Sequence, residues 1–522
     1  MISRTSLPLL PLPNGRVHMQ EETFAIPSPL GVSLEKWGAL ASEYLAVFAG
    51  RAGVELTEEA PPLLRFFRNP VFPFEGYRLR VTAEHGIQVE ASTERGICWA
   101  LVTLCALLEN NRVPLCDIMD APAYPHRGIL LDCARHFFPV TVVKDFIEAI
   151  SLAKINVLHW HLTDDQGWRV ESKRFPALHE QCAPDYYTQE ELRDIVAFAE
   201  ARGVEIIPEI DLPGHTTSIL AAYPELSCSE KQLELAPKWG IYSIILCAGK
   251  EAVFDLLLPL LEEIAGLFPS ERFHLGGDEA PKGEWENCPL CRQRMQDEGL
   301  ASAEELQGWF TARAAGHLRK LGKHPICWNE SLLADCLPAL APDLTIQYWA
   351  ELHKGGTTQR FFQNGGSVIF ADAINTYLDQ PYGLVPMKTV YAYQPAFPGA
   401  AVQGAPLGME SCVWTEYIET PERLAEMAFP RAYALAEAAW TKPARKNYKN
   451  FRCRLALWLE RFPGLGFTPP EQADPALAER YKQRLAFLDI QKNAPRPENH
   501  AGVGGRPELA YLLRFFRGVL LP

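Results

Sequence analysis

The chain has 522 residues and a formal net charge of −14 at pH 7. Its 22% of charged residues is an ordinary globular share, which argues against a mainly disordered protein. The acidic balance argues against a nucleic-acid partner or an anionic membrane surface, because both require a surplus of Lys and Arg. A neutral substrate is expected instead, with a few local carboxylates carrying the chemistry.

The N-terminal end carries a leucine-rich run, Leu7–Leu12, in which prolines break any helix. Only Arg4 is basic before this run and no small-residue cleavage site follows it, so we expect no secretory signal. No stretch of about 20 apolar residues occurs, so we expect no membrane-spanning helix. The thirteen cysteines, an odd number, fit free thiols in a cytoplasmic protein.

Residues 1–122 are expected to form a small α/β domain. Alternating apolar residues predict strands at Tyr77–Val81 and Ile87–Ala91, and an apolar helical run follows at Ile97–Glu109. The segment 120–125 is a natural linker, because its two prolines resist both helix and strand. We expect this front domain mainly to support the domain that follows.

Residues 123–462 alternate short apolar runs with helical patterns, which predicts a parallel sheet closed into a (β/α)8 TIM barrel. Four of the helices are expected at Val142–Ala153, Gln189–Ala201, Ala252–Leu267 and Ala303–Leu321. The eight expected strands are Gly128–Arg135, Val157–Asp164, Val204–Leu212, Arg272–Glu279, Pro325–Glu330, Thr345–Glu351, Ser367–Ala373 and Leu407–Glu416. Residues 463–522 are expected to form a C-terminal helical tail, with an amphipathic helix over Glu508–Leu520.

The chemistry is expected where the strands end, because the loops at the C-terminal ends of barrel strands form one open face. Acids and aromatic residues follow nearly every apolar run. The sharpest element is Gly276-Gly277-Asp278-Glu279, where two small residues leave room for a ligand beside the backbone. Neighbouring strand residues point to opposite faces, so the backbone must relax for both acids to reach one substrate. Such a pair indicates general acid work by one member and charge stabilisation by the other.

Cys288 and Cys291 form a CxxC pair. A structural zinc site of this kind needs a second pair at suitable spacing, and the sequence shows none. We therefore predict no metal site and no cofactor.

Seven segments of the chain resemble the motifs of a known enzyme family and occur in the same order as in that family. They are Ile87–Gly96, Arg127–Pro139, Asn156–Trp168, Pro213–His215, His274–Ala280, Glu410–Glu416 and Ala436–Trp440. Together they resemble the glycoside hydrolase family 20 β-N-acetylhexosaminidases, and the resemblance spans residues 75–440. The family implies the same barrel behind a front domain, and its catalytic motif resembles His274–Ala280.

The resemblance implies a retaining, exo-acting enzyme that uses substrate-assisted catalysis, an exception to the two-carboxylate scheme. The 2-acetamido oxygen of the substrate attacks the anomeric carbon, an oxazolinium ion forms, and water opens it with retained configuration. Glu279 would protonate the leaving oxygen and later deprotonate that water. Asp278 would orient the acetamido N–H, and Tyr377 would hydrogen-bond the acetamido oxygen. An N-acetylhexosamine-containing glycan is the implied partner, and no metal is needed.

The remaining site positions carry over as binding residues or as tuning residues. Trp328, Trp349 and Trp414 would wall the acetyl pocket, with Trp414 under the sugar ring. His215 and Asp164 would form a buried relay that tunes Glu279, or a purely structural pair. The hydroxyls at the non-reducing end would be bound by Arg135, Asp379 and Glu416. These contacts would close the pocket and impose exo action.

Two alternative functions stay open beside this one. The first is an enzyme of the same fold that releases disaccharides or acts on sulfated N-acetylglucosamine. The loops after the third and eighth strands would determine this specificity. The second is a sugar-binding protein without turnover, which the presence of both Asp278 and Glu279 argues against. The sequence leaves undetermined the natural glycan, the linkage, the gluco or galacto preference and the oligomeric state.

Overall fold

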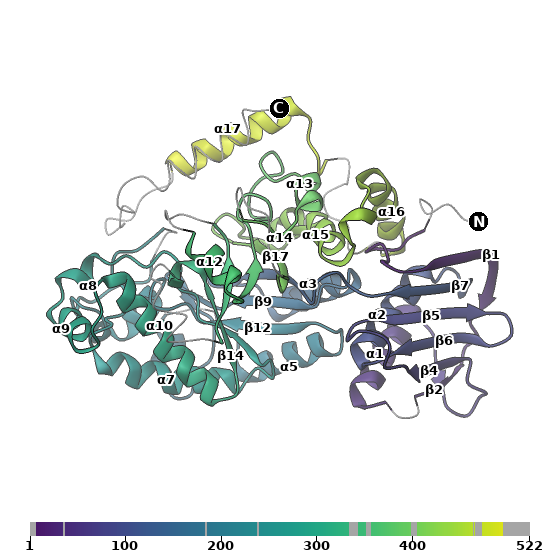
Figure 1. The fold of residues 1–522 in the computed structure, drawn as a ribbon, viewed down its shortest axis with the longest axis horizontal. Coiled ribbons are helices and arrows are strands. Elements are labelled where there is room, and N and C mark those ends of the chain that lie inside the picture. Colours follow the sequence, from purple (N-terminus) through teal and green to yellow (C-terminus); the bar gives the residue numbers. More distant parts are fainter. Residues whose placement is uncertain are drawn as a thin grey trace.

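The fold was obtained as a computed structural model, shown in Figure 1. The structure describes residues 7–34, 37–182, 185–236, 240–332, 343–350, 356–397, 405–462, 464 and 472–493. A seven-stranded sheet domain and a closed eight-stranded barrel lie side by side (Figure 1). The expected helix Glu508–Leu520 lies outside the described residues, as does Glu351 at the end of the sixth expected strand.

The front domain is one mixed sheet with two helices on one face. Helix α2 (Glu94–Leu107) packs against strands β5 and β6, and helix α1 (Ala39–Ala52) packs against α2. Strand β5 buries every second residue, as the alternating pattern predicts. In sheet order the strands are β1 (Val17–Ala25), β7 (Arg112–Asp120), β5 (Tyr77–Thr82), β6 (Gly86–Ala91), β4 (Leu64–Arg68), β2 (Leu30–Ser33) and β3 (Leu56–Thr57).

The second domain is a closed barrel of eight parallel strands, which confirms the predicted TIM barrel. Strands β8, β9 and β17 are buried along their whole length, as expected where helices cover the outside of a parallel sheet. In chain order the barrel strands are β8 (His126–Asp132), β9 (Val157–His161), β12 (Glu205–Glu209), β13 (Arg272–His274), β14 (His324–Trp328), β15 (Thr345–Tyr348), β16 (Ser367–Phe370) and β17 (Gly408–Val413).

Helices follow the barrel strands, and the four predicted ones lie within two residues of their expected bounds. They are α3 (Val140–Leu152), α5 (Gln189–Glu200), α7 (Glu251–Ala265) and α10 (Ala303–Lys320). Helix α5 begins at a capping box in which Thr188 and Glu191 satisfy each other's backbone amides. The other helices are α4 (Ala177–Glu180), α6 (Thr217–Ala222), α8 (Gly283–Asn287), α9 (Pro289–Asp297), α12 (Thr357–Gln363), α13 (Met387–Ala392), α14 (Pro421–Ala428), α15 (Arg431–Trp440), α16 (Tyr448–Arg461) and α17 (Leu477–Asn493).

The barrel strands end earlier than the apolar runs suggest, and this corrects the predicted bounds. Strand β13 ends at His274, whereas the pattern extended the strand to Glu279. Gly276 and Gly277 have φ values of 63° and 107°, and Glu279 has a φ of 44°. These angles lie in the left-handed region, which does not continue an extended strand, so the chain leaves the sheet before the two acids.

A buried ion pair fixes the front domain to the barrel near the start of strand β8. The Arg127 guanidinium is fully buried and donates to both carboxylate oxygens of Glu75, at 2.6 and 2.9 Å. The Trp99 indole of helix α2 donates to the same carboxylate at 2.9 Å. Breaking such a pair leaves an uncompensated buried charge, so the two domains are held in a fixed relation.

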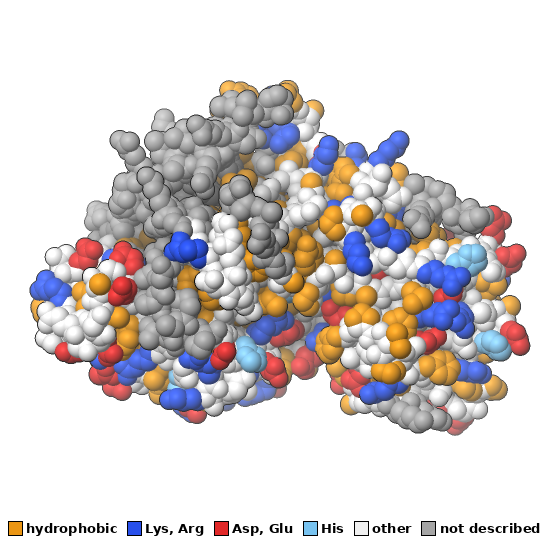
Figure 2. All heavy atoms as spheres, in the orientation of Figure 1, with side chains coloured by type: hydrophobic (Ala, Val, Ile, Leu, Met, Phe, Trp, Pro, Cys, Tyr) orange, Lys and Arg blue, Asp and Glu red, His pale blue; other side chains and the backbone are white. Residues whose placement is uncertain are grey.

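The surface carries charges of both signs. Figure 2 shows acidic and basic side chains interspersed over the sheet domain and the barrel on the face that it displays. Among the residues with an assigned position, no helix is both long enough and apolar enough to cross a bilayer.

Candidate active site

The predicted site residues all follow the carboxyl ends of barrel strands. This placement is a direct result of the parallel topology, which turns every one of these loops to the same end of the barrel. They are Arg135 after β8, Asp164 after β9, His215 after β12, Asp278 and Glu279 after β13, Trp328 at the end of β14, Trp349 after β15, Tyr377 and Asp379 after β16, and Trp414 and Glu416 after β17.

The two adjacent acids are positioned by the glycine pair before them. A Cβ on Gly276 would lie 1.8 Å from the carboxylate of Asp211, so only glycine fits there. The Gly277 amide donates to the same Asp211 oxygen at 2.9 Å. The chain therefore turns tightly over strand β12 and presents both Asp278 and Glu279 at the barrel mouth.

The Glu279 carboxyl lies in a crowded electrostatic environment at the rim of the site. Its side chain is 32% exposed, and its backbone amide donates to the Glu330 carboxylate. Burial raises the pKa of Glu279 to about 8, and the negative charges of Glu330 and Asp278 add to this shift against the opposing effect of His215 and Arg135. Glu279 is therefore mostly protonated at neutral pH, the state that a general acid needs.

Four aromatic side chains form a box beside the acids. Trp328 and Trp414 lie 6.0 Å apart between ring centroids, and Tyr377 lies 6.2 Å from Trp414. Trp349 stacks on Tyr377 with an interplanar angle of 22°. Trp328 is 1% exposed, and its indole donates to Glu209 at 2.8 Å, so Trp328 forms the buried floor of the box.

Arg135 connects the box to the acids on neighbouring strands. Its guanidinium lies 2.8 Å from Asp164, 3.3 Å from Asp132, and 5.0 Å from the centroid of the Trp414 ring. The two carboxyls predicted to bind hydroxyls lie close enough to influence each other. Burial raises the pKa of Asp379 well above its usual range, with Glu416 adding to the shift, and burial also raises the pKa of Glu416.

Several buried polar atoms around the box have no hydrogen-bond partner within the described protein. Buried polar groups are nearly always satisfied, so such atoms mark a surface shaped to receive polar groups of a ligand. They are Arg135 Nε, Asp278 Oδ1, Trp349 Nε1 and Asp379 Oδ1.

A series of alternating histidines and carboxylates descends from the acids into the barrel, and we call it the His–carboxylate ladder. His215 Nε2 lies 3.7 Å from Glu279 Oε2, and His215 Nδ1 lies 3.2 Å from Asp164 Oδ1. The ladder thus contains the predicted His–Asp pair but extends far beyond it. Below Asp164 it continues, each member within ion-pair distance of the next, through His161, Glu209, His159, Glu410 and His126.

The ladder keeps its buried members charged except at its far end, where burial lowers the pKa of His126. Burial alone lowers the pKa of His161, yet Glu209 and Asp164 outweigh it and raise that pKa well above the usual range. Burial alone raises the pKa of Asp164, yet Arg135 and His215 outweigh it and hold that pKa well below the usual range. These charges are thereby stabilised by their neighbours. The member of the ladder nearest the acid is His215, which lies 3.7 Å from Glu279.

The sequence interpretation gave no role in the site to the carboxylates Asp211, Glu209, Glu330 and Glu410. A signal was present, because Glu209 and Glu410 lie inside apolar runs, where an acid is rarely buried without a partner. His159 and His161 also stand two residues apart on one strand, which places both side chains on the same face.

Three groups among the described residues are compact enough to hold a metal ion. Two belong to the barrel interior, namely His159 with Glu209 and His274, and Asp164 with Asp211 and His215. The third contains the CxxC pair, and it corrects the view that this pair has no cysteine partners. The structure brings two distant cysteines to it, which gives the group Cys228, Cys247, Cys288 and Cys291.

Comparisons with known proteins agree with this geometry. The model of the catalytic domain of glycosyl hydrolase family 20 matches residues 124–443, and the model of the family's domain 2 matches residues 6–121. A β-hexosaminidase of Porphyromonas gingivalis is 37% identical over 416 residues, which are 73% of this chain and 52% of the relative. This chain thus spans about half the length of that relative.

Two further relatives cover more of their own length. A β-hexosaminidase of Akkermansia muciniphila is 32% identical over 434 residues, which are 77% of this chain and 87% of the relative. The crystal structure of an exo-β-N-acetylglucosaminidase from Vibrio harveyi in complex with N-acetylglucosamine has a TM-score of 0.78 and 31% identity. That match covers 89% of this chain and 78% of the other.

Proposed function

Because this chain belongs to glycoside hydrolase family 20, we propose that it is an exo-acting, retaining β-N-acetylhexosaminidase. Its substrate is a glycan that ends in β-linked N-acetylglucosamine or N-acetylgalactosamine at the non-reducing end. The observation that carries this proposal is the position of Glu279, whose pKa is raised to about 8, beside Asp278 and the aromatic box at one barrel mouth. The named β-hexosaminidases among its relatives support the same reaction.

The proposed chemistry divides between the protein and the substrate. Glu279 donates its proton to the glycosidic oxygen while the acetamido oxygen of the substrate attacks the anomeric carbon. The glycosidic C–O bond breaks, and the rest of the glycan leaves as an alcohol. Asp278 accepts a hydrogen bond from the acetamido N–H and stabilises the positive charge of the oxazolinium ion. Tyr377 donates to the acetamido oxygen, and the acetyl methyl lies in the aromatic box. Water then adds to the anomeric carbon as Glu279, now ionised, takes a proton from it. The bond from that carbon to the acetamido oxygen breaks, which restores the acetamido group.

The rate should depend on pH through the acid. Since the pKa of Glu279 is raised to about 8, we expect kcat/KM to fall as pH rises through about 8, where the acid loses its proton. Replacing Glu330 with Gln removes a charge that raises this pKa, so that variant should lose activity at a lower pH. The pH profiles of kcat/KM for the parent and for the Glu330→Gln variant, on a substrate with a poor leaving group, measure both effects. An activity that stays level to pH 10 would contradict the assignment.

Closure of the pocket at the non-reducing end should impose exo action. We propose that Arg135, Asp379 and Glu416 bind the terminal hydroxyls. In support, Arg135 and Asp379 each hold a buried polar atom with no partner in the described protein. We expect a long oligosaccharide to lose one sugar at a time, as followed by mass spectrometry of early products. Mid-sized fragments at early times would refute the closed pocket.

Assays of a set of aryl glycosides, run side by side, can distinguish the proposed specificity from the alternatives. The proposal predicts cleavage of N-acetyl-β-glucosaminides, N-acetyl-β-galactosaminides or both, and inactivity on the parent hexosides, which lack the attacking acetamido group. Activity only on disaccharide or 6-sulfated glycosides would favour the divergent-specificity alternative. Binding without turnover of any of them would favour a sugar-binding protein.

We further propose that the protein works in the cytoplasm, where thiols stay reduced. In support, all twelve cysteines among the described residues are free thiols, and most are buried. The thiol count given below with the cysteine cluster tests this placement.

A further inference from the structure

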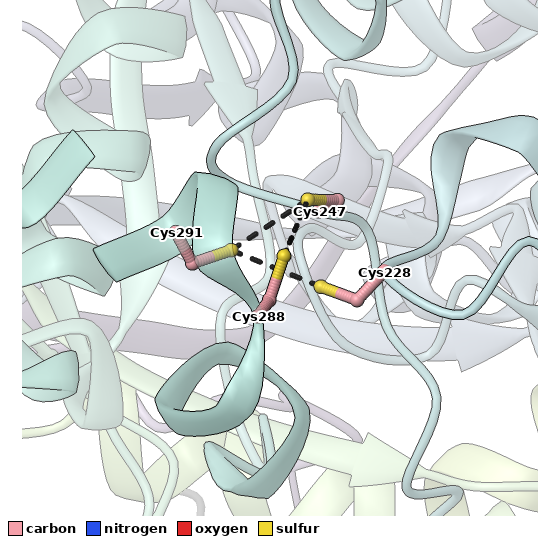
Figure 3. Close-up of side chains that lie close together, drawn as sticks. All are labelled: Cys228, Cys247, Cys288 and Cys291. Atoms are coloured by element: carbon pink, nitrogen blue, oxygen red, sulfur yellow. Dashed lines mark hydrogen bonds between the residues drawn. The ribbon is translucent and has the colours of Figure 1, made fainter. Parts of the chain in front are cut away.

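Four cysteine side chains from three segments of the chain converge (Figure 3). The sulfur of Cys247 lies 3.6 Å from that of Cys291 and 3.9 Å from that of Cys288. The sulfur of Cys228 lies 3.8 Å from that of Cys291. All four sulfurs lie within 4.8 Å of one another, and we call the group the four-cysteine cluster.

Local structure holds each pair of the four-cysteine cluster in place. An isolated antiparallel bridge between Ser227 and Leu246 sets Cys228 beside Cys247, although the two segments are far apart in sequence. Cys288 and Cys291 occupy the first turn of helix α9, with a proline at the start of the helix. The two pairs are pressed together at Gly249, where an added Cβ would lie 2.3 Å from the backbone of Leu290 in that turn.

The sulfur spacing matches one particular coordination geometry. A zinc ion with four sulfur ligands has Zn–S distances of about 2.3 Å, which places tetrahedral sulfurs about 3.8 Å from one another. Three of the six sulfur–sulfur distances, 3.6 to 3.9 Å, lie on either side of this value, and all six are within 4.8 Å. A disulfide would require about 2.05 Å, so the cluster has the spacing of metal ligands and not of bonded pairs.

We propose that Cys228, Cys247, Cys288 and Cys291 bind one zinc ion in a closed structural site. Four thiolates select a soft, tetrahedral ion, and the small space between the sulfurs admits a single ion rather than an iron–sulfur cluster. Each thiol that is neutral before binding releases its proton as its sulfur coordinates the ion. A site with four protein ligands leaves no position for substrate, so the ion takes no part in the reaction.

The position of the four-cysteine cluster gives the ion a structural role. Leu246, next to Cys247, donates its amide to the carbonyl of Pro213 in the loop that carries His215. On the other side, the Trp285 indole of helix α8 donates to the carbonyl of Leu246. Helix α8 follows directly after the loop that carries Glu279. The ion therefore fastens together the two loops that hold the acid and its histidine.

Metal content tests the proposal independently of activity. We expect about one zinc per chain by inductively coupled plasma mass spectrometry, in protein purified from its own cells or from a cytoplasmic host without chelators. Cys288→Ser and Cys228→Ser should each lower the zinc content at least tenfold. Cys453→Ser, which replaces an exposed cysteine outside the cluster, is the matched control and should keep the ion. Glu279→Gln should also keep it, which separates the ion from the proposed chemistry.

A second measurement uses the unaltered chain, so it stands even where a cysteine variant fails to fold. An organomercurial reagent that displaces zinc from thiolates should release one ion, seen with a chromogenic chelator, and should lower the unfolding midpoint by about 5 °C or more. Thiol counting in denaturant with a chelator and no reductant should then find all thirteen cysteines free. Protein without stoichiometric zinc, protein with another metal in its place, or disulfides within the cluster would each overturn the proposal.

Discussion

Glu279→Gln is expected to lower kcat by about 10²- to 10⁴-fold on substrates with a poor leaving group, because the amide has the shape of the acid but no proton to donate. The loss should shrink on aryl substrates whose leaving group departs without protonation. The two effects are measured by comparing kcat for an oligosaccharide and for a strongly activated aryl glycoside. Glu271→Gln is the matched control, since Glu271 is 81% exposed just before the opposite end of strand β13.

The same variant should also change stability in a defined direction. A carboxyl whose pKa is raised on folding opposes the folded state increasingly as pH rises from its unfolded value to about 8. Gln cannot ionise, so Glu279→Gln should unfold at a higher temperature than the parent at pH 8 and at a similar temperature at pH 4. Full activity on a poor leaving group, or no gain in stability at pH 8, would remove Glu279 from its assigned role.

Substrates with fluorine in the N-acetyl group should react more slowly with each added fluorine. Fluorine withdraws electron density from the acetamido oxygen, and that oxygen is the nucleophile in the proposed reaction. The proposal also predicts tight binding of a thiazoline that mimics the oxazolinium ion, because ligands resembling the transition state bind far better than substrate. The series of kcat/KM values for mono-, di- and trifluoroacetyl substrates measures the first effect, and inhibition by the thiazoline measures the second.

The competing scheme makes the opposite prediction for the same substrates. In the ordinary retaining reaction a carboxylate attacks the anomeric carbon, and Asp278 is the natural candidate because it adjoins Glu279. A flat fluorine series would favour that scheme, as would a covalent sugar on Asp278 in mass spectrometry of trapped protein. The aromatic box favours self-attack, because Trp328, Trp349 and Tyr377 cluster at the same barrel mouth as that carboxyl, where they could enclose the acetyl group of a substrate.

The barrel itself was predictable from the sequence, because its strands are continuous apolar runs between recurrent helical patterns. The limits of those strands were not. Apolar residues continue past His274, but a pattern of hydrophobicity carries no information on the backbone angles that end the ladder at Gly276 and Gly277. The two acids were nevertheless located correctly with respect to the mouth, since a strand end and the following loop lie at the same edge.

Contacts between distant residues account for what the sequence did not reveal. Glu330 reaches the acid only because strand β14 pairs with β13, which places its loop beside the backbone of Glu279. Cys228 and Cys247 stand as single cysteines, 63 and 44 residues before Cys291, so no spacing rule connects them with it. Such groups form only after folding, when the topology has fixed which loops are neighbours.

Helix α2 bears on whether the two sequence units of this chain can exist apart. Every residue from Gly96 to Leu107 is buried, so the helix has no face turned to solvent. One side lies on the sheet, and on the other Trp99 packs edge-on against Trp440 of helix α15, with ring centroids 6.3 Å apart. A barrel expressed without residues 1–122 would present that aromatic surface, and the unpaired Arg127, to water. The family models divide the chain between Ala121 and Tyr124, but the Arg127–Glu75 ion pair and the Trp99–Trp440 contact both cross that division, so we expect neither part to be stable alone.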